Sequence, residues 1–417
     1  MKSKIKREVE NETTIDTKKV KEKGKNCFNI LEVVIIMIIT IICTATIVIK
    51  VSYSINNKKE NVVVDTELLE LKDTYTSIVK EYYEDIDKDE LVASAIEGMI
   101  EYLDDPYSTY MDEEESTAFT QELEGEYVGI GTEISLSSNG KVTIINIFDD
   151  SPAAKAGLKL KDVIKKVDNN SIEGKTLSEI SALIKGKSGT GVNLTVTRDG
   201  KDIDLNIIRG KVDLPSVKSK IIETNKKKIG YIDVDVFANN TFEQFEKNID
   251  DLKSKGIESI IIDLRWNTGG YLSTAHSMAE LFLNKGDVMY QLDTKGSIKK
   301  ITSQVEKKYD FNVVVLVNKS TASASEIFTA ALKENINAEV VGVTTYGKGK
   351  VQKTRTLSNG AMVKYTIQNW LTPSGNEIDG KGIEPTVKVE LSDKYYENAN
   401  EKNDNQLGKA LEILSKK

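Results

Sequence analysis

The chain has 417 residues, 39% of them hydrophobic, and this length is typical of two or three domains. Its net charge of -8 excludes the broad basic surface that nucleic-acid binding needs, so we expect no nucleic acid as a partner. The expected partners are polypeptides or small molecules.

The N-terminal part of the chain has the pattern of a membrane segment. Residues 1–26 carry nine Lys/Arg against five Asp/Glu, and the 17 residues 33–49 are uncharged. Such a run is just long enough to cross a bilayer, and the positive excess before it predicts a cytoplasmic N-terminus. We therefore expect a transmembrane signal anchor over 27–50 and an extracytoplasmic remainder. A cleaved secretory signal, with a weak site at Thr44-Ala45-Thr46, is the alternative.

Both cysteines, Cys27 and Cys43, lie in the predicted anchor. The exported part therefore has no thiol for a disulfide, a nucleophile or a metal site. A single histidine excludes a His-rich metal site, and the acidic residues lack the spacing of a carboxylate site. We expect neither a metal nor an organic cofactor.

The three regions that follow the predicted anchor differ in the spacing of their apolar residues. Apolar residues at helical spacing run from Thr66 to about Thr120, interrupted at "DDPYSTYM" (104–111), where Pro106 disfavours a helix. From Gly125 the period is two, with short strands and one clear helix, "TLSEISALIKG", which predicts a small β-rich domain. From about Val212 strands and helices alternate, which predicts a sheet covered by helices.

A glycine-containing turn, "DLRWNTGGYL" (263–272), follows an apolar strand and precedes a helix. Its bare backbone N–H groups suit an oxyanion, and they suit a phosphate equally well. The spacing does not match a nucleotide-binding loop.

A cluster of hydroxyls, "STASASEIFTAAL" (320–332), also stands between an apolar strand and a helix. A hydroxyl at a helix N-terminus gains from the positive end of the helix dipole. Capping is the commoner use of Ser and Thr there, and it explains Thr321, Ser323 and Ser325 equally well. The pattern alone does not select a nucleophile.

Few residues could act as a general base. A Ser-His-Asp triad would have to use the sole histidine, His276, which the pattern also explains as an inert helical residue. A buried lysine is the other option, and Lys348 stands between two glycines at the end of an apolar strand. Lys350 competes with it, because strand alternation would place both on one face. Two ordinary exposed lysines remain an equal alternative.

Seven motifs follow one another along the chain: "DDPYSTYM", "YVGIG", "SPAAKAGL", "DLRWNTGG", "STASASEIFTAAL", "TYGKGKVQ" and "LTPSG". This order resembles that of C-terminal processing peptidases, which are PDZ-containing serine proteases, over about residues 66–416. The resemblance implies an α+β multidomain fold whose protease core resembles the Clp protease and crotonase superfamily. The implied division is 1–26 cytoplasmic segment, 27–50 anchor, 51–120 linker and helical region, 121–211 PDZ domain, 212–390 protease core, and 391–417 C-terminal tail and helix.

The resemblance also implies roles for single residues. Ser323 corresponds to the family's nucleophile, Lys348 to its general base and Gln352 to the glutamine that orients the base. Gly269 and Ala324 correspond to the residues whose N–H groups form the oxyanion hole. The segment "YVGIG" stands at the peptide carboxylate-binding loop, which is implied to include Val128, Gly129, Ile130 and Gly131.

Four residues depart from the family pattern. Thr321 replaces a serine beside the nucleophile, and Lys161 occupies a turn position that is usually Gly. Trp266 and Thr268 stand where Asn and Pro are usual, so we expect a different cleft wall.

We therefore expect a membrane-anchored extracytoplasmic serine endopeptidase that recognises the free C-termini of protein or peptide substrates through its PDZ domain. The resemblance is compatible with regulatory or signalling proteolysis and with a homodimer. One alternative is an inactive membrane-anchored PDZ scaffold, but the Ser, Lys and Gln of the implied site are all present. Another is crotonase-like acyl-CoA chemistry, which leaves the PDZ domain unexplained.

Overall fold

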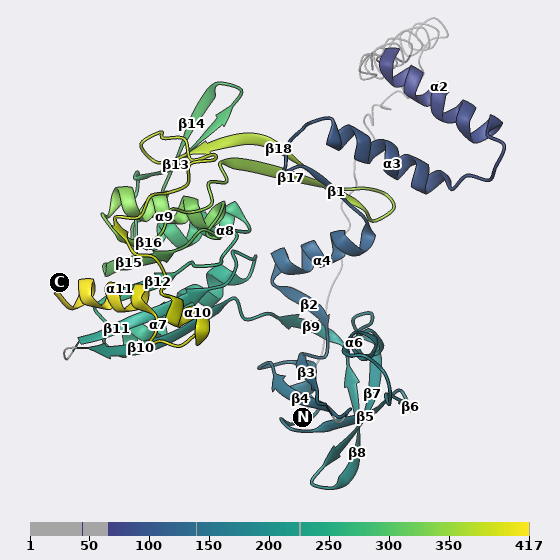
Figure 1. Cartoon of the computed structure of the whole chain (residues 1–417), viewed down its shortest axis with the longest axis horizontal. Helices are drawn as coiled ribbons and strands as arrows, with labels where there is room; N and C mark the ends of the chain where they lie inside the picture. Colours follow the sequence, from purple (N-terminus) through teal and green to yellow (C-terminus); the bar gives the residue numbers. More distant parts are fainter. Residues whose placement is uncertain (1–43, 45–65, 139, 225–226, 417) are drawn as a thin grey trace, which may run out of the picture. The chain divides into compact units, whose positions relative to one another are not determined.

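The computed structural model describes residues 66–138, 140–224 and 227–416, together with Thr44 (Figure 1). The chain divides into two compact units, Met1–Lys88 and Asp89–Lys417. Apart from Thr44, the anchor predicted over 27–50 lies outside the described residues. Within the described part, no helix combines the length and the apolar character needed to cross a bilayer.

The predicted helical region contains three helices: α2 (Thr66–Glu81), α3 (Lys88–Glu101) and α4 (Glu113–Glu124). Helix α4 begins at a capping box, in which the Asp112 carboxylate accepts the Glu115 N–H at 2.8 Å. It ends at Gly125, whose φ of 68° is the left-handed conformation that glycine tolerates best. The predicted interruption is a loop that leads into β1 (Thr109–Met111).

The β-rich domain is an antiparallel sheet in the order β3-β4-β5-β7-β8, with β6 paired to β5. Its elements are β3 (Thr132–Leu136), β4 (Val142–Ile147), α5 (Pro152–Lys155), β5 (Val163–Val167), β6 (Asn170–Ser171), α6 (Leu177–Ile184), β7 (Gly191–Arg198) and β8 (Lys201–Ile208). Strands β2 (Glu126–Gly129) and β9 (Gly210–Asp213) pair with each other in a separate two-stranded sheet. In the sequence, β2 directly precedes this domain and β9 directly follows it. The predicted helix is α6.

The third region contains a six-stranded sheet in the order β10-β11-β12-β15-β16-β19. Its strands are β10 (Val217–Thr224), β11 (Lys227–Val234), β12 (Ser259–Asp263), β15 (Asn312–Val317), β16 (Glu339–Gly342) and β19 (Val387–Lys388). All neighbours from β11 to β19 are parallel. The intervening helices are α7 (Thr241–Ser254), α8 (Leu272–Glu280) and α9 (Ala324–Asn335). The predicted alternation of strands and helices is confirmed.

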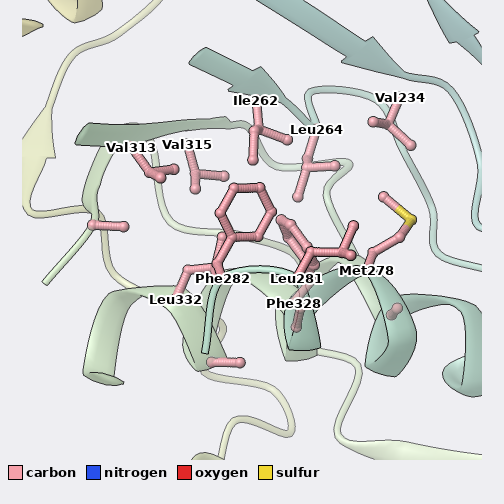
Figure 2. Packing of buried hydrophobic residues seen from close by; sticks show 14 of the residues in the cluster. Val234, Ile262, Leu264, Met278, Leu281, Phe282, Val313, Val315, Phe328 and Leu332 are labelled. Atoms are coloured by element: carbon pink, nitrogen blue, oxygen red, sulfur yellow. The ribbon is translucent and has the colours of Figure 1, made fainter. Parts of the chain in front are cut away.

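Both faces of this sheet are covered, so its strands read as continuous apolar runs. Alternate residues such as Ile262 and Val315 pack with Phe328 and the other apolar residues of α7, α8 and α9 (Figure 2). The intervening residues, such as Ile261, pack with α11 (Asn405–Lys416) on the opposite face. The turn after β12 is tied to α11 by Arg265, whose buried guanidinium pairs with Asp404 at 2.7 Å.

A second sheet of the third region contains β1, β13 (Val288–Thr294), β14 (Ser297–Thr302), β17 (Lys350–Thr356) and β18 (Met362–Leu371). Strand β18 is central, since it pairs with β1, β13 and β17. Helix α10 (Asp393–Glu397) follows near the C-terminus. Lys348 lies in the loop 343–349 between β16 and β17. The expected apolar strand ends at Gly342, so strand alternation does not apply to Lys348.

Candidate active site

Ser323 stands at the junction between β15 and α9. It occupies the N-cap position of α9 with φ 54° and ψ -118°, a combination that is strained for a residue with a side chain. Such strain is found where surrounding contacts force it, often at functional sites. The helix that starts at Ala324 directs its positive end toward this residue.

The neighbouring hydroxyls are occupied elsewhere. Thr321 Oγ1 donates to the Leu264 carbonyl at 2.8 Å, and Ser325 Oγ donates to the Asn267 carbonyl at 3.0 Å. Both side chains are buried, so they fasten the Ser323 loop to the glycine-containing turn. Ser323 is the one hydroxyl residue of 320–325 that lines the adjacent cleft.

This cleft has a volume of about 500 Å³ and is built from several elements. Its lining includes the residues Phe119, Thr268, Gly269, Ser323, Ala324, Lys348, Lys350, Gln352, Lys364 and Trp370. The structure thus brings together all five residues for which the sequence resemblance implied catalytic or oxyanion roles. His276, on α8, is not among the lining residues. It lies beside Glu280 of the same helix and the ring of Tyr290 on β13.

Gly269 packs directly against the Ser323 loop. Its φ is 112°, and a Cβ at this position would lie 3.0 Å from the Ser323 Cβ and 3.1 Å from the Ala324 nitrogen. The Gly269 N–H donates to Asn267 Oδ1 at 2.9 Å, whereas the Ala324 N–H has no acceptor among the described residues. Of the two implied oxyanion donors, only Ala324 is therefore free in this state.

The two glycines beside Lys348 permit close packing. A Cβ on Gly347 would lie 2.8 Å from the Gly382 nitrogen, and one on Gly349 would lie 2.7 Å from the Asp379 Cβ. Lys348 is half-buried, with Nζ 5.1 Å from the centre of the Tyr107 ring. Burial, and then the charge of Lys364, lower the pKa of Lys348, while Asp105 and Glu326 act in the opposite direction.

The Glu326 carboxylate connects the Ser323 loop with the loop that contains Lys348. Glu326 is fully buried, and its Oε2 accepts the N–H of Ser323 at 2.8 Å and the N–H of Lys348 at 2.9 Å. Its Oε1 accepts the Gly347 N–H at 2.7 Å and the Thr345 hydroxyl. Burial raises the pKa of Glu326, and these donors oppose the rise. The sequence showed Glu326 only as an acidic residue in the first turn of a helix.

Gln352 extends from β17 toward β18. Its Nε2 lies 3.4 Å from Thr366 Oγ1, and that hydroxyl donates to Asp105 at 2.6 Å. Burial raises the pKa of Asp105, but hydrogen bonds from Ser108 and Thr366 outweigh this and leave the pKa below its usual value. The "DDPYSTYM" loop therefore reaches the active-site region, which no local sequence pattern revealed.

At two of the departing positions the backbone explains why the family uses Asn or Gly. Trp266 has φ 64° and Lys161 has φ 71°, the left-handed region in which Asn or Gly is less strained. Thr268 lines the cleft, but Trp266 does not and instead stacks on Tyr395 with ring centres 6.2 Å apart. The expectation of an altered cleft wall therefore applies to Thr268 and is wrong for Trp266.

A second, narrower groove of about 50 Å³ lies on the β-rich domain between β3 and α6. Its lining includes Gly129, Ile130 and Thr132, whereas Val128 pairs with Lys211 in the β2–β9 ladder. Strand β3 is the edge of its sheet, so its outer side is available for pairing with another strand.

Tyr127 lines this groove as well. Its ring covers Gly129, where a Cβ would lie 2.5 Å from Tyr127 Cε2. The N–H groups of Gly131 and Thr132 lie near the Tyr127 hydroxyl and oppose the rise that burial causes in the pKa of Tyr127. The loop to which the resemblance assigned a peptide carboxylate thus lies beside the phenol group of Tyr127.

Comparison with known proteins identifies three family models along the chain. Residues 228–389 match peptidase family S41, residues 128–208 match the PDZ domain, and residues 43–115 match the activating protease CtpB N-terminal domain.

Two curated relatives cover most of the chain. The carboxy-terminal processing protease CtpA of Bacillus subtilis is 40% identical over 362 residues, 86% of this chain and 77% of the relative. A "Probable CtpA-like serine protease" of Staphylococcus haemolyticus is 35% identical over 388 residues, 91% of this chain and 77% of the relative. Among solved structures, a photosystem II D1 C-terminal processing protease matches with 26% identity and a TM-score of 0.45, over 77% of this chain and 86% of that chain.

Proposed function

The chain belongs to peptidase family S41 as a serine-type carboxyl-terminal processing peptidase with a PDZ domain, and on this premise we propose that Ser323 and Lys348 are its catalytic dyad. The observation that carries the proposal is their shared cleft. Ser323 and the half-buried Lys348 both line it, and the Glu326 carboxylate holds the backbone of both residues.

The proposed reaction starts with Lys348 in its neutral form. Lys348 Nζ accepts the proton of Ser323 Oγ while Oγ bonds to the scissile carbonyl carbon. The Ala324 N–H stabilises the resulting oxyanion, and the Gly269 N–H joins it after leaving Asn267. The Lys348 ammonium then returns its proton to the departing amine as the C–N bond breaks. Water, deprotonated by Lys348, hydrolyses the acyl-enzyme by the same steps.

We propose that substrates enter through their C-termini. A peptide strand pairs with the free edge of β3, and its carboxylate takes the N–H groups of Gly131 and Thr132. Because the Tyr127 phenol lies near these donors, the peptide carboxylate competes with it for them. Val128, Gly129 and Ile130 then contribute backbone shape to the loop and do not supply the main donors.

We further propose that residues 27–50 anchor the peptidase in the cell membrane with its protease domain outside. The support is the uncharged run 33–49 behind a basic segment. Protease treatment of intact cells should degrade the domain, and alkaline extraction should leave the full-length chain in the membrane. Release of a shortened chain would instead indicate a cleaved signal.

The dyad is tested by comparing Ser323→Ala with Ser325→Ala on an unfolded protein substrate. Ser323→Ala and Lys348→Met should lose cleavage by about 10⁴-fold or more, with peptide binding by the PDZ domain retained. Full activity in Ser323→Ala, together with loss in Ser325→Ala, would overturn the assignment. Wild-type binding without any cleavage would favour the scaffold alternative.

A further inference from the structure

The loop segment 347–349, which carries Lys348, is held at every backbone polar group. Its three N–H groups donate to carboxylates, two to Glu326 at 2.7 and 2.9 Å and one to Asp379 at 3.0 Å. The first of its three carbonyl groups accepts the Gly380 N–H at 2.8 Å. Because the segment lies outside the strands and helices, these hydrogen bonds take the place of a sheet ladder in fixing its course.

Trp370 supplies the donors for the other two carbonyl groups. Its indole N–H donates to the Lys348 carbonyl at 2.9 Å, and its backbone N–H donates to the Gly349 carbonyl at 2.9 Å. Glu326 thus holds the peptide group before the Lys348 Cα, and Trp370 holds the peptide group after it. Among the described side chains, the Trp370 indole is the one that bonds to the Lys348 carbonyl.

Trp370 is itself firmly placed. It lies on β18, where it pairs with Leu292 of β13, and only 1% of its surface is exposed. Its ring belongs to the apolar core of the third region and also lines the cleft that contains Ser323 and Lys348. A buried indole N–H normally has a partner, and here that partner is the backbone of the proposed base.

We propose that Trp370 is a positioning residue of the dyad, whose indole N–H fixes the Lys348 peptide group so that the lysine side chain extends into the cleft toward Ser323. A lysine side chain has a flexible four-carbon stem, and Gly347 and Gly349 leave the backbone around it free to turn. The direction of the stem therefore depends on the hydrogen bonds to the flanking peptide groups. Proton transfer from Ser323 Oγ to Lys348 Nζ needs close alignment, and a displacement of about 1 Å costs about 10²-fold in rate.

Two other roles for Trp370 would have different signatures. If the indole only filled the core, its N–H would matter for stability and not for the rate of the folded enzyme. If the ring only contacted the substrate, its replacement would raise KM and leave kcat unchanged. A positioning role instead lowers kcat at constant KM, because the bound substrate meets a misplaced base.

The test replaces the indole N–H alone, in the full chain. 3-Benzothienylalanine at position 370 keeps the shape of the ring but has sulfur in place of the N–H, whereas 5-fluorotryptophan keeps the donor. On a fluorogenic peptide we expect 3-benzothienylalanine to lower kcat about tenfold with KM within about twofold, and 5-fluorotryptophan to restore kcat to within about twofold of the wild type. Labelling of Ser323 by a fluorophosphonate, in which Oγ displaces fluoride without any peptide contact, should slow by a similar factor when the N–H is absent.

The chain offers a matched control, since its other tryptophan, Trp266, is exposed and does not line the cleft. 3-Benzothienylalanine at position 266 should leave kcat within about twofold of the wild type. Equal kcat for the two analogues at position 370 would overturn the proposal, and so would a rise in KM alone. The role of Trp370 rests on the proposed dyad, but the two fail differently: an active Lys348→Met refutes the dyad, whereas an inactive Lys348→Met with equal kcat for the two analogues refutes only the role of Trp370.

Discussion

The backbone N–H groups of Ser323 and Lys348 donate to the same oxygen, Oε2 of Glu326, at 2.8 and 2.9 Å. The two residues are 25 positions apart and lie in different loops. Because Glu326 is fully buried, its carboxylate fixes the separation of these loops without contacting solvent. The proposed nucleophile and the proposed base are therefore held by one side chain that takes no part in the proposed proton transfer.

Glu326→Gln should damage both stability and activity. The amide replaces one acceptor oxygen with an NH₂ group that faces N–H donors, so buried donors lose their partner. We expect a loss of about 3 kcal/mol in the free energy of unfolding, measured by urea denaturation, and a fall in kcat/KM. The control is Glu243→Gln, because Glu243 occupies the corresponding position in the first turn of α7 but is exposed. Equal stability of the two variants would contradict the bridging role.

Ser323→Gly should be inactive yet more stable than Ser323→Ala. Both lack the hydroxyl, but only glycine adopts φ 54° and ψ -118° without strain. We expect a difference of about 1 kcal/mol in the free energy of unfolding. If Ser323→Ala were the more stable of the two, the backbone at residue 323 would not be strained.

Lys348→Met should stabilise the protein at neutral pH. Burial and Lys364 lower the pKa of Lys348 below its ordinary value of 10.5, so the folded state binds this proton less well than the unfolded chain. The wild type therefore gains stability as pH rises from the folded pKa toward 10.5, and the variant does not. At pH 7 we expect the free energy of unfolding of Lys348→Met to exceed that of the wild type by about 1 kcal/mol. This difference should become smaller as the pH approaches 10.

Thermal unfolding of both proteins between pH 7 and pH 10.5 gives this comparison. The exposed control Lys353→Met should show a stability difference that does not change with pH. A constant advantage of Lys348→Met over this range would mean that packing, and not charge burial, is responsible.

Tyr127→Phe should strengthen binding of peptides with a free C-terminus. The substitution keeps the ring over Gly129 but removes the oxygen that lies near the Gly131 and Thr132 N–H groups. Loss of this competing acceptor should improve Kd by about three- to tenfold, measured by fluorescence anisotropy. A C-terminally amidated peptide is the control, and it should gain much less. Weaker binding of the free peptide would show that the phenol contributes to the bound state.

Local patterns predicted much of the fold. The strand before the hydroxyl cluster and the helix after it are set by apolar periodicity and by small polar residues at the junction, so Ser323 was expected at a helix start. The helix begins at Ala324, directly after it. The glycines around Lys348 were expected to allow close approach, and the contacts of Gly347 and Gly349 explain why a side chain would not fit.

The rest depends on contacts between distant parts of the chain. Glu326 receives donors from positions 345 to 348, and Asp105 receives the Thr366 hydroxyl from 261 residues away. No period or spacing encodes these pairs, because only the assembled sheet brings β1 beside β18. Lys348 was expected at the end of a strand because the residues before it are apolar. The strand in question, β16, stops pairing with β15 at Gly342, so Lys348 lies in the loop that follows. The selection of Ser323 over Ser325 likewise needed a family resemblance, since both are small hydroxyl residues near a helix start.

The β2–β9 ladder lies, in the sequence, between two parts of the chain that line the same cleft. Residues before it, such as Phe119 and Asp105, and residues after it, such as Ser323 and Lys348, belong to the same cleft and its surroundings. The PDZ domain is thus an insertion within the peptidase, joined by four residue pairs from Glu126↔Asp213 to Gly129↔Gly210. If the proposed tail recognition holds, a PDZ domain from a relative grafted between these two strands should redirect the peptidase to other tails. A fragment starting at residue 228 would lack the part of the cleft wall that Phe119 forms.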